Sequence, residues 1–93
     1  YSPYHMLGSS LATCTWSVLA SWAQQAGLST GDLAIEVRWS FVDDPHRVGS
    51  ITLTFFWESL PEVRRQAAQR AARLCPIHHT LSVPPEITIE VGS

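Results

Sequence analysis

The stretch from residue 3 to residue 25 constrains the fold of this chain more than any other. Its middle carries no charged side chain, and five residues with apolar character recur at helical spacing: Leu7, Leu11, Cys14, Val18 and Trp22. Further apolar side chains lie on a second face, namely Trp16, Leu19 and Ala20. The pattern predicts a helix over residues 3–25 that is buried on most of its sides. Ser2 suits its N-cap, Pro3 its first turn and Gly27 its C-terminal end.

Two alternating segments follow this helix. Residues 32–42 and 50–58 alternate between apolar and polar side chains, which is typical of strands with one buried face. The inward positions are Ile35, Val37, Trp39 and Phe41 in the first segment, and Ile51, Leu53, Phe55 and Trp57 in the second. Between them, Asp44, Pro45 and Gly49 indicate a turn over residues 42–50. The two segments are therefore predicted to pair as an antiparallel hairpin.

Residues 59–74 are predicted to form a second helix. Ser59 and Glu62 match a capping box, and Pro61 suits the first turn. Its expected inward positions are Val63, Ala67, Ala71 and Leu74. Pro76 is expected to end this helix, because proline cannot continue it. A short turn then leads to a predicted last strand over residues 86–91, whose inward positions are Ile87, Ile89 and Val91.

The predicted order is helix, strand, strand, helix, strand. This order indicates an α+β fold in which two helices pack on one face of a small antiparallel sheet. Three strands make a thin sheet, so we expect pairing with another chain, or with a segment before Tyr1, to complete it. We treat residues 1–93 as a single domain, and expect it to be a fragment that lacks an N-terminal β segment. The apolar content of 45 % in 93 residues also favours burial against a partner subunit.

Charge and composition argue against several functions. The net charge is −2, and the six basic residues are all arginines that form no patch, so we expect no nucleic-acid partner. No apolar run approaches the ~20 residues that span a bilayer, so we expect no membrane partner either. Two cysteines sixty-one positions apart do not make the dense disulfide framework of small secreted domains. This favours a cytoplasmic location.

The two cysteines, Cys14 and Cys75, allow three interpretations from the residues alone. They are small apolar side chains in the core, a redox pair, or part of a metal site. Cys75 and His78 have the spacing of half a zinc site, to which Cys14 or His5 could add a ligand. No second pair of ligands at such spacing follows, so we expect neither a metal ion nor a cofactor.

Two segments resemble the motifs of one protein family. The first contains Pro3, Tyr4, Leu7, Leu11, Ala12 and Cys14, and the second contains Cys75, Pro76, Ile77, His78, Thr80 and Leu81. In this order and at this separation they resemble the central helix and the second cysteine segment of the OsmC/Ohr superfamily. This superfamily comprises osmotically inducible protein C and organic hydroperoxide resistance proteins. The resemblance covers nearly the whole chain, and it implies an OsmC-like fold and an intertwined homodimer.

The same resemblance implies a thiol-dependent peroxidase that reduces organic hydroperoxides. Cys14 would be the peroxidatic cysteine, Cys75 the resolving cysteine, and a dithiol reductant would restore both thiols. The substrate-pocket candidates are Tyr4, Leu11, Trp16 and His78. The alternative is a non-catalytic dimer of the same fold that binds a small apolar ligand.

In this interpretation, some other group must lower the pKa of the Cys14 thiol. Burial alone raises a thiol pKa, and Cys14 lies about three turns into its helix, too far for help from the helix dipole. Members of the family that reduce peroxides supply an arginine from strands before the central helix. That arginine is often held by a glutamate near the start of the helix, where this chain has Tyr4. We therefore expect a cation beside Cys14.

Overall fold

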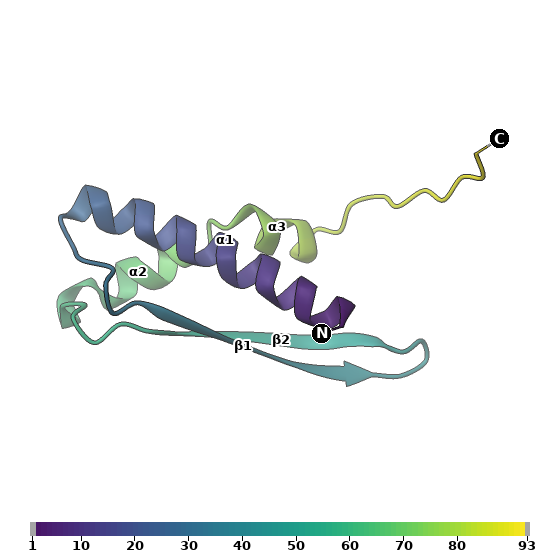
Figure 1. Ribbon diagram of the computed structural model, residues 1–93, viewed down its shortest axis with the longest axis horizontal. Coiled ribbons are helices and arrows are strands. Elements are labelled where there is room, and N and C mark those ends of the chain that lie inside the picture. The colour runs from purple at the N-terminus through teal and green to yellow at the C-terminus, as the bar shows by residue number, and fades with distance from the viewer. Residues whose placement is uncertain (1, 93) are drawn as a thin grey trace.

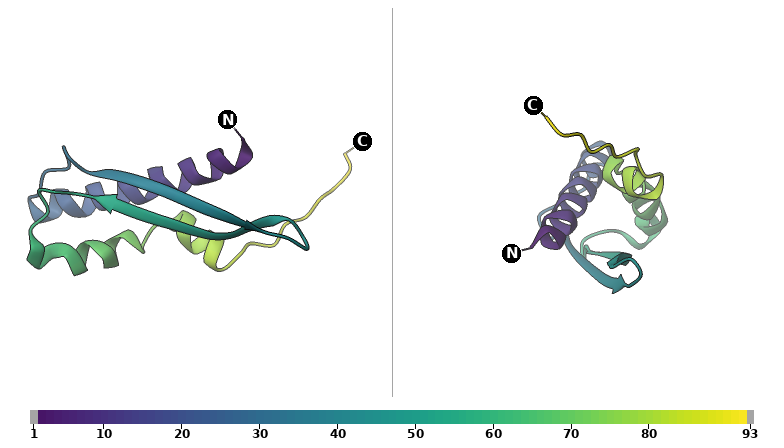
Figure 2. Two further views of the ribbon diagram at one scale, coloured as in Figure 1. Left: turned by 90° about the horizontal axis from the view of Figure 1, so that it is seen from below. Right: turned by 90° about the vertical axis from the view of Figure 1, so that its right-hand side faces the viewer.

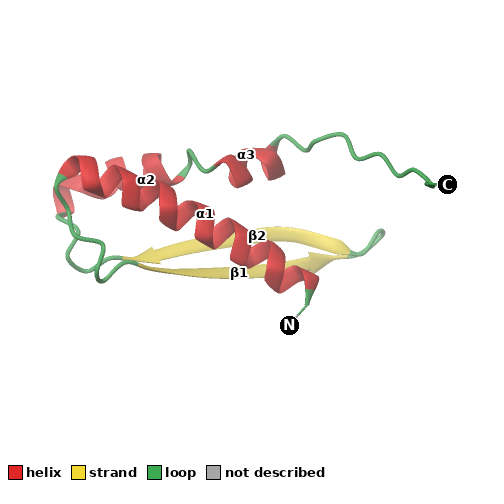
Figure 3. Cartoon of the chain, turned by 45° about the horizontal axis from the view of Figure 1, so that its top comes forward, coloured by secondary structure: helices red, strands yellow, loops and turns green. Residues whose placement is uncertain are grey.

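The computed structural model describes residues 2–92 and shows an α+β fold, as predicted. Helix α1 spans Pro3–Ala26, α2 spans Arg65–Ala72 and α3 spans Pro76–Ser82, with a short 3-10 turn η1 at Glu62–Arg64. Strands β1, Ala34–Val42, and β2, Arg47–Phe56, form an antiparallel hairpin. Helix α1 runs along the hairpin, while α2 and α3 follow each other beside α1 (Figures 1 and 3). All three helices lie on the same side of the hairpin (Figure 2).

Helix α1 begins and ends as the sequence predicts. The Ser2 hydroxyl accepts a hydrogen bond from the backbone N–H of His5, and the His5 ring accepts one from the backbone N–H of Ser2. Gly27 ends the helix in the left-handed conformation, with φ of 72°. Glycine adopts this conformation without the steric cost that a β-carbon brings. These caps satisfy backbone groups that a helix terminus otherwise leaves without partners.

The buried stripe of α1 differs from the predicted one. Its members are Gly8, Leu11, Thr15, Leu19 and Ala23. Beyond Leu11 the stripe runs one position later than predicted, so Cys14 lies at its half-buried margin and Thr15 lies inside it. Thr15 is 5 % exposed, and this burial of a hydroxyl requires a hydrogen-bond partner.

The hairpin confirms the predicted pairing but not the length of its turn. The apolar positions Ile35, Val37 and Trp39 are half-buried and alternate with exposed polar ones. The turn is only four residues long, because β2 already begins at Arg47. Gly49 therefore lies within β2, as the extra residue of a bulge between the pairs Ser40–Ser50 and Phe41–Val48. A β-carbon at Gly49 would collide with the Val42 side chain.

The predicted helix over residues 59–74 is shorter than expected. Ser59 does not form a capping box: its backbone N–H and its hydroxyl both donate to the Asp32 carboxylate, each at 2.7 Å. Pro61 is extended, with ψ of 140°, so regular helix begins only at Arg65. Ala68 and Ala71 face the core, whereas Val63 and Leu74 are 90 % and 65 % exposed, so two of the predicted inward positions were wrong.

The C-terminal part differs most from prediction. Pro76 does interrupt the helical path, but it also begins α3 as its first residue, with Cys75 as the N-cap. The expected strand over residues 86–91 does not form, and residues 84–92 extend away from the body (Figure 1). Ile87, Ile89 and Val91 are at least 81 % exposed. The prediction was wrong because alternation defines the two faces of a strand but supplies no edge to pair with. Within residues 2–92 the sheet has two strands instead of three.

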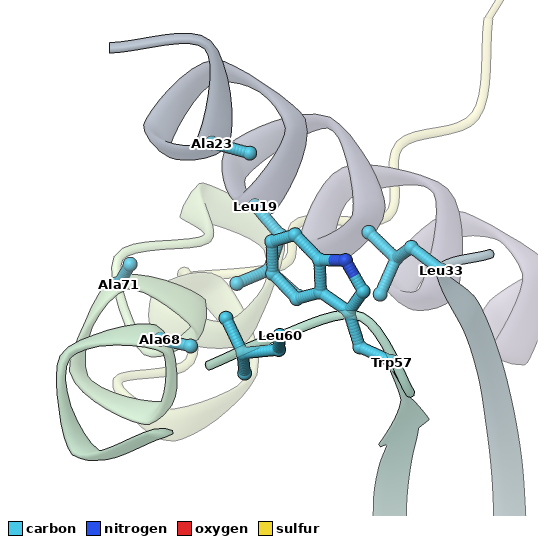
Figure 4. Packing of buried hydrophobic residues seen from close by; sticks show 7 residues of the cluster. All are labelled: Leu19, Ala23, Leu33, Trp57, Leu60, Ala68 and Ala71. Carbon is cyan, nitrogen blue, oxygen red and sulfur yellow. The ribbon is translucent and has the colours of Figure 1, made fainter. Parts of the chain in front are cut away.

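The buried core lies at the open end of the hairpin. It joins the C-terminal half of α1 to α2 through Leu19, Ala23, Leu33, Trp57, Leu60, Ala68 and Ala71. Trp57 lies at its centre, between Leu19, Leu33 and Leu60 (Figure 4), and its indole N–H donates to the Ser29 carbonyl at 2.9 Å. This core fixes α2 against α1. Cys75, in the short link from α2 to α3, is thereby held beside the middle of α1.

Candidate redox site

The structure brings the two cysteines together from positions sixty-one residues apart. Cys14 comes from the middle of α1, and Cys75 comes from the link between α2 and α3. Both are free thiols, and their side chains share a hydrogen bond. Cys75 exposes 0 % of its surface, whereas Cys14 is half-buried. The pair therefore has one sulfur near the surface and one behind it.

Several donors converge on the Cys75 sulfur. The backbone N–H of His78 donates to Sγ at 3.4 Å, because Cys75 caps α3 through its side chain. The backbone of Ile77, the Thr15 side chain and the Cys14 thiol add further hydrogen bonds. Burial raises the pKa of Cys75, but these hydrogen bonds together outweigh it and lower that pKa below its ordinary value.

Cys14 shifts in the opposite direction. Its hydrogen bond to Cys75 raises the pKa of the Cys14 thiol. The backbone of Ile77 lowers this pKa in part, while burial and the charge on Cys75 raise it further. In the described part of the chain, hydrogen bonds, burial and the partner sulfur set both pKa values, and no cation contributes. The arginine expected beside Cys14 is therefore not found within residues 2–92.

Two neighbouring cavities of about 340 Å³ each lie next to the pair. Both are bounded by Ile51, Leu53 and His78, and their walls are formed by neighbours of the cysteines rather than by the sulfurs. The first extends along α1 and is lined by Leu7, Leu11, Val48 and Leu81 among others. The second includes Thr15, Phe55, Gln69 and Arg73. A mainly apolar chamber with a few polar groups suits a small organic molecule.

The four predicted pocket residues do not gather at one place. Leu11 and His78 line the first cavity, next to the cysteine pair. Tyr4 instead packs edge-on against Phe41, with ring centroids 4.8 Å apart, near the turn of the hairpin. Trp16 donates through its indole N–H to the Leu33 carbonyl at 3.3 Å, and it lines a separate hollow with Ile35. Two of the four thus lie away from the thiols.

Among residues 2–92, no three His, Cys, Asp or Glu side chains gather closely enough to hold a metal ion. In the same range, no helix has the length and apolar character needed to cross a bilayer.

Comparison with known proteins decides the family. The sequence model of the OsmC-like proteins matches residues 1–90. The chain belongs to the OsmC-like family. Its fold also matches a crystal structure from Psychrobacter arcticus, of a protein named for an osmotic stress induced and detoxification response. The TM-score is 0.73, with 27 % sequence identity over 86 % of this chain. This OsmC-like chain spans 59 % of the length of that protein. No curated protein matches its sequence significantly.

Thr15 is the site residue of this OsmC-like chain that the sequence analysis missed. A threonine directly after a cysteine carries no motif, and the predicted stripe passed through Cys14 instead. The signal that could have found it is the spacing Leu11, Thr15, Leu19, which places Thr15 on the buried face. A polar residue within an otherwise apolar stripe needs a partner inside the fold.

Proposed function

We propose that this protein is a thiol-dependent peroxidase that reduces organic hydroperoxides through Cys14 and Cys75. The observation that carries the proposal is the hydrogen-bonded pair of free thiols beside an apolar cavity. Membership in the OsmC-like family supports it. We also propose that the protein works in a reducing cytoplasm, where a dithiol reductant is available.

The proposed reaction is a two-electron transfer to the hydroperoxide. The Cys14 sulfur attacks one oxygen of the O–O bond, which breaks, and the other oxygen leaves with its organic group and becomes an alcohol. Cys14 is then a sulfenic acid. The Cys75 thiolate attacks its sulfur, hydroxide leaves and takes up a proton, and a disulfide forms. A dithiol reductant reverses that oxidation by thiol–disulfide exchange.

The cavities fit the organic group of such a substrate. Leu7, Leu11 and Leu81 offer an apolar wall in the first cavity, where Leu11 lies one turn of α1 before Cys14, and His78 lines both chambers. An apolar group that leaves water for this chamber gains free energy in proportion to the area it buries. Small hydroperoxides without such a group gain less. The proposed substrates are therefore organic hydroperoxides in preference to hydrogen peroxide.

The proposed working form is a homodimer. The segment 84–92 keeps the alternation of a strand, with Ile87, Ile89 and Val91 exposed, and the hairpin presents two edges. A second copy of this chain offers an edge on which this segment can pair and bury its apolar face. The mass of the protein in solution, measured by light scattering, tests the proposal. A monomer at micromolar concentration contradicts it.

The direct test of the function is hydroperoxide consumption by the full-length protein with a dithiol reductant. The parent is compared with Cys14→Ser and with Ser17→Ala, which changes an exposed residue one turn along α1. We expect loss of turnover in Cys14→Ser and parental turnover in Ser17→Ala. Equal rates in the parent and Cys14→Ser would rule out the mechanism.

A second function, binding of a small apolar ligand without catalysis, rests on a different observation. Within residues 2–92 no cation lowers the pKa of Cys14, yet two adjacent cavities are open beside it. Calorimetry with a hydroperoxide and with the corresponding alcohol separates the two functions. Equal affinity for both compounds, with no hydroperoxide consumed, favours the binding protein.

A further inference from the structure

We propose, resting on the function proposed above, that the surface formed by α2, α3 and the link between them is the docking site of the reductant, and that this reductant is an acidic protein carrying the dithiol. The surface is defined by the exposed basic side chains of residues 63–85, and we call it the basic ridge: Arg64, Arg65, Arg70, Arg73, His78 and His79. A small free dithiol would need no such surface.

The basic ridge has a charge opposite to that of the rest of the chain. Residues 63–85 hold four of the six arginines and none of the eight acidic residues, although the whole chain has a net charge of −2. Helices α2 and α3 follow each other beside α1, so these basic side chains belong to one part of the surface (Figure 3). The fold thereby gathers arginines that were expected from the sequence to form no patch.

Little of this charge is neutralised within the chain. Among residues 2–92, the ion pair of the ridge joins Arg65 to Glu62, at 3.6 Å between Nε and Oε2. In the same range Arg64, Arg70 and Arg73 form no ion pair with an acidic residue, and their side chains are exposed. Three guanidinium groups of the ridge are therefore available to the carboxylates of another molecule.

The stability of α2 does not account for its arginines. A cation suits the C-terminal end of a helix, where Arg70 lies, but not the N-terminal end. Arg64 and Arg65 lie at that N-terminal end, and the first turn of α2 contains no acidic residue. Arg70 and Arg73 are three positions apart on the exposed side of the helix, and like charges at this spacing repel. An acidic partner would relieve both of these unfavourable interactions.

The basic ridge borders the redox pair. Arg73 precedes Cys75 by two positions, and His78 follows it by three. Both Arg73 and His78 line the second cavity, together with Thr15, the neighbour of Cys14 in α1. No acidic residue of the described chain lines either cavity beside the pair. A partner held by the ridge would therefore bring its dithiol to the half-buried Cys14.

The exchange balances between the two proteins. A thiolate of the partner attacks the Cys14 sulfur of the disulfide, because Cys14 is half-buried whereas Cys75 exposes 0 % of its surface. The bond between the cysteines breaks, Cys75 leaves as a thiolate, and a mixed disulfide joins Cys14 to the partner. The second thiolate of the partner attacks the partner sulfur of that bond and releases Cys14. The partner becomes a disulfide, and its two thiol protons pass to Cys14 and Cys75.

The first experiment measures reduction of the preformed disulfide in the full-length protein, which needs no hydroperoxide. Two synthetic peptides serve as reductants, each with a Cys-Gly-Pro-Cys segment, flanked by glutamates in one and by glutamines in the other. Each rate is divided by the rate of the same peptide with hydroxyethyl disulfide, which corrects for intrinsic reactivity. At low ionic strength we expect a corrected preference of about tenfold for the glutamate peptide, because opposite charges steer association. High salt should abolish this preference.

Matched double variants locate the surface. Arg64→Gln with Arg70→Gln removes two charges from the basic ridge, and Arg38→Gln with Arg47→Gln removes two exposed charges from the hairpin. Arg73 is left in place because it also lines a cavity. We expect the first variant to lose about threefold or more of the preference and the second to keep it, with parental rates for both toward dithiothreitol, a neutral dithiol. Equal losses in the two variants, or no loss in the first, would overturn the inference.

Other anionic partners are distinguished by the same variants. The parent and both double variants are sedimented with phosphatidylglycerol vesicles and titrated with single-stranded RNA. Suppose that the parent shows no preference for the glutamate peptide but binds vesicles or RNA through Arg64 and Arg70. The ridge is then a surface for that other partner, and the inference is wrong.

The two proposals fail in different ways. A parent that consumes no hydroperoxide refutes the peroxidase, while the peptide preference still decides the docking surface. If no disulfide forms, the same preference is measured as binding of cysteine-free peptides to the reduced protein by fluorescence anisotropy. An active parent without preference for the glutamate peptide refutes the docking surface and leaves the peroxidase intact.

Discussion

Oxidation of the cysteine pair should stabilise this protein strongly. Cys14 and Cys75 already share a hydrogen bond, so the two sulfurs need only a small approach to form an intramolecular disulfide. The cross-link would close a loop of sixty-one residues, which covers most of the chain and includes the whole hairpin. We therefore expect a larger free energy of unfolding for the oxidised protein than for the reduced one.

The magnitude follows from the length of that loop. A cross-link removes conformational entropy from the unfolded chain, and for a loop of this size the gain is about 4 kcal/mol. Oxidation also alters the hydrogen bonds that Thr15 and His78 make to the Cys75 sulfur, at about 1 kcal/mol each. The expected net gain is therefore about 2–4 kcal/mol. Since such domains unfold with about 5–15 kcal/mol in total, this is a large fraction.

The assay is urea unfolding at fixed protein concentration, followed by tryptophan fluorescence, because Trp57 lies in the core. Intact mass first shows whether two hydrogen atoms per chain have been lost without dimer formation. Cys14→Ser, taken through the same oxidation, is the control and should unfold alike before and after. The slope of the unfolding free energy against urea concentration is fitted separately for the oxidised and the reduced protein, because a cross-linked unfolded chain exposes less surface.

Two results would refute the reasoning. If mild oxidant gives no cross-link within one chain, the two thiols are not neighbours. If the cross-link forms and stability stays unchanged or falls, strain in the folded state cancels the entropy gain, and the site is not arranged for a disulfide.

Three further predictions concern the scaffold. Leu19→Ala should lower the free energy of unfolding in urea by about 2–5 kcal/mol, because Leu19 is 0 % exposed. Met6→Ala, at a 60 % exposed position, should change it by less than about 0.5 kcal/mol. Equal effects of the two substitutions would contradict the assigned core. Gly49→Ala should cost about 1–3 kcal/mol through its collision with Val42, and Gly92→Ala, with open space around it, should be neutral in the same urea unfolding assay. The Ser59 hydrogen bonds lower the pKa of Asp32, so they add stability that is fully present above the ordinary carboxyl pKa of ~3.9 and is lost as pH falls through the lowered value. Asp32→Asn should reduce the fall in unfolding free energy at acidic pH. An unchanged fall would contradict the contribution assigned to Asp32.

The parts of the fold that sequence predicts well are those that local signals determine. The bounds of α1 follow from Ser2, Pro3 and Gly27, which act within one turn of the helix ends. The hairpin follows from period-two alternation, which its register preserves on both sides of the bulge. Membership in the OsmC-like family follows from two short motifs, and the match over residues 1–90 confirms it.

The parts that sequence predicts poorly depend on contacts made across the fold. Ser59 has the sequence of a helix cap, yet Asp32 supplies a charged acceptor for both of its donors. A charge-assisted pair of hydrogen bonds is stronger than the neutral cap it replaces. Residues 86–91 have the pattern of a strand, but strand formation requires an edge, and within residues 2–92 no such pairing occurs. In both cases the deciding partner lies far away in sequence.

The one-position offset in the stripe of α1 has the largest chemical consequence. Had the stripe passed through Cys14, both sulfurs would be buried, and a hydroperoxide would have no thiol to reach. Because the stripe passes through Thr15, Cys14 is turned to the margin and a hydroxyl is turned toward Cys75. Pro76 completes the arrangement from the other side, since by starting α3 it directs the backbone N–H of His78 at the same sulfur. The surroundings of the Cys75 sulfur are therefore set by the residues that follow each cysteine, Thr15 after Cys14 and Pro76 after Cys75.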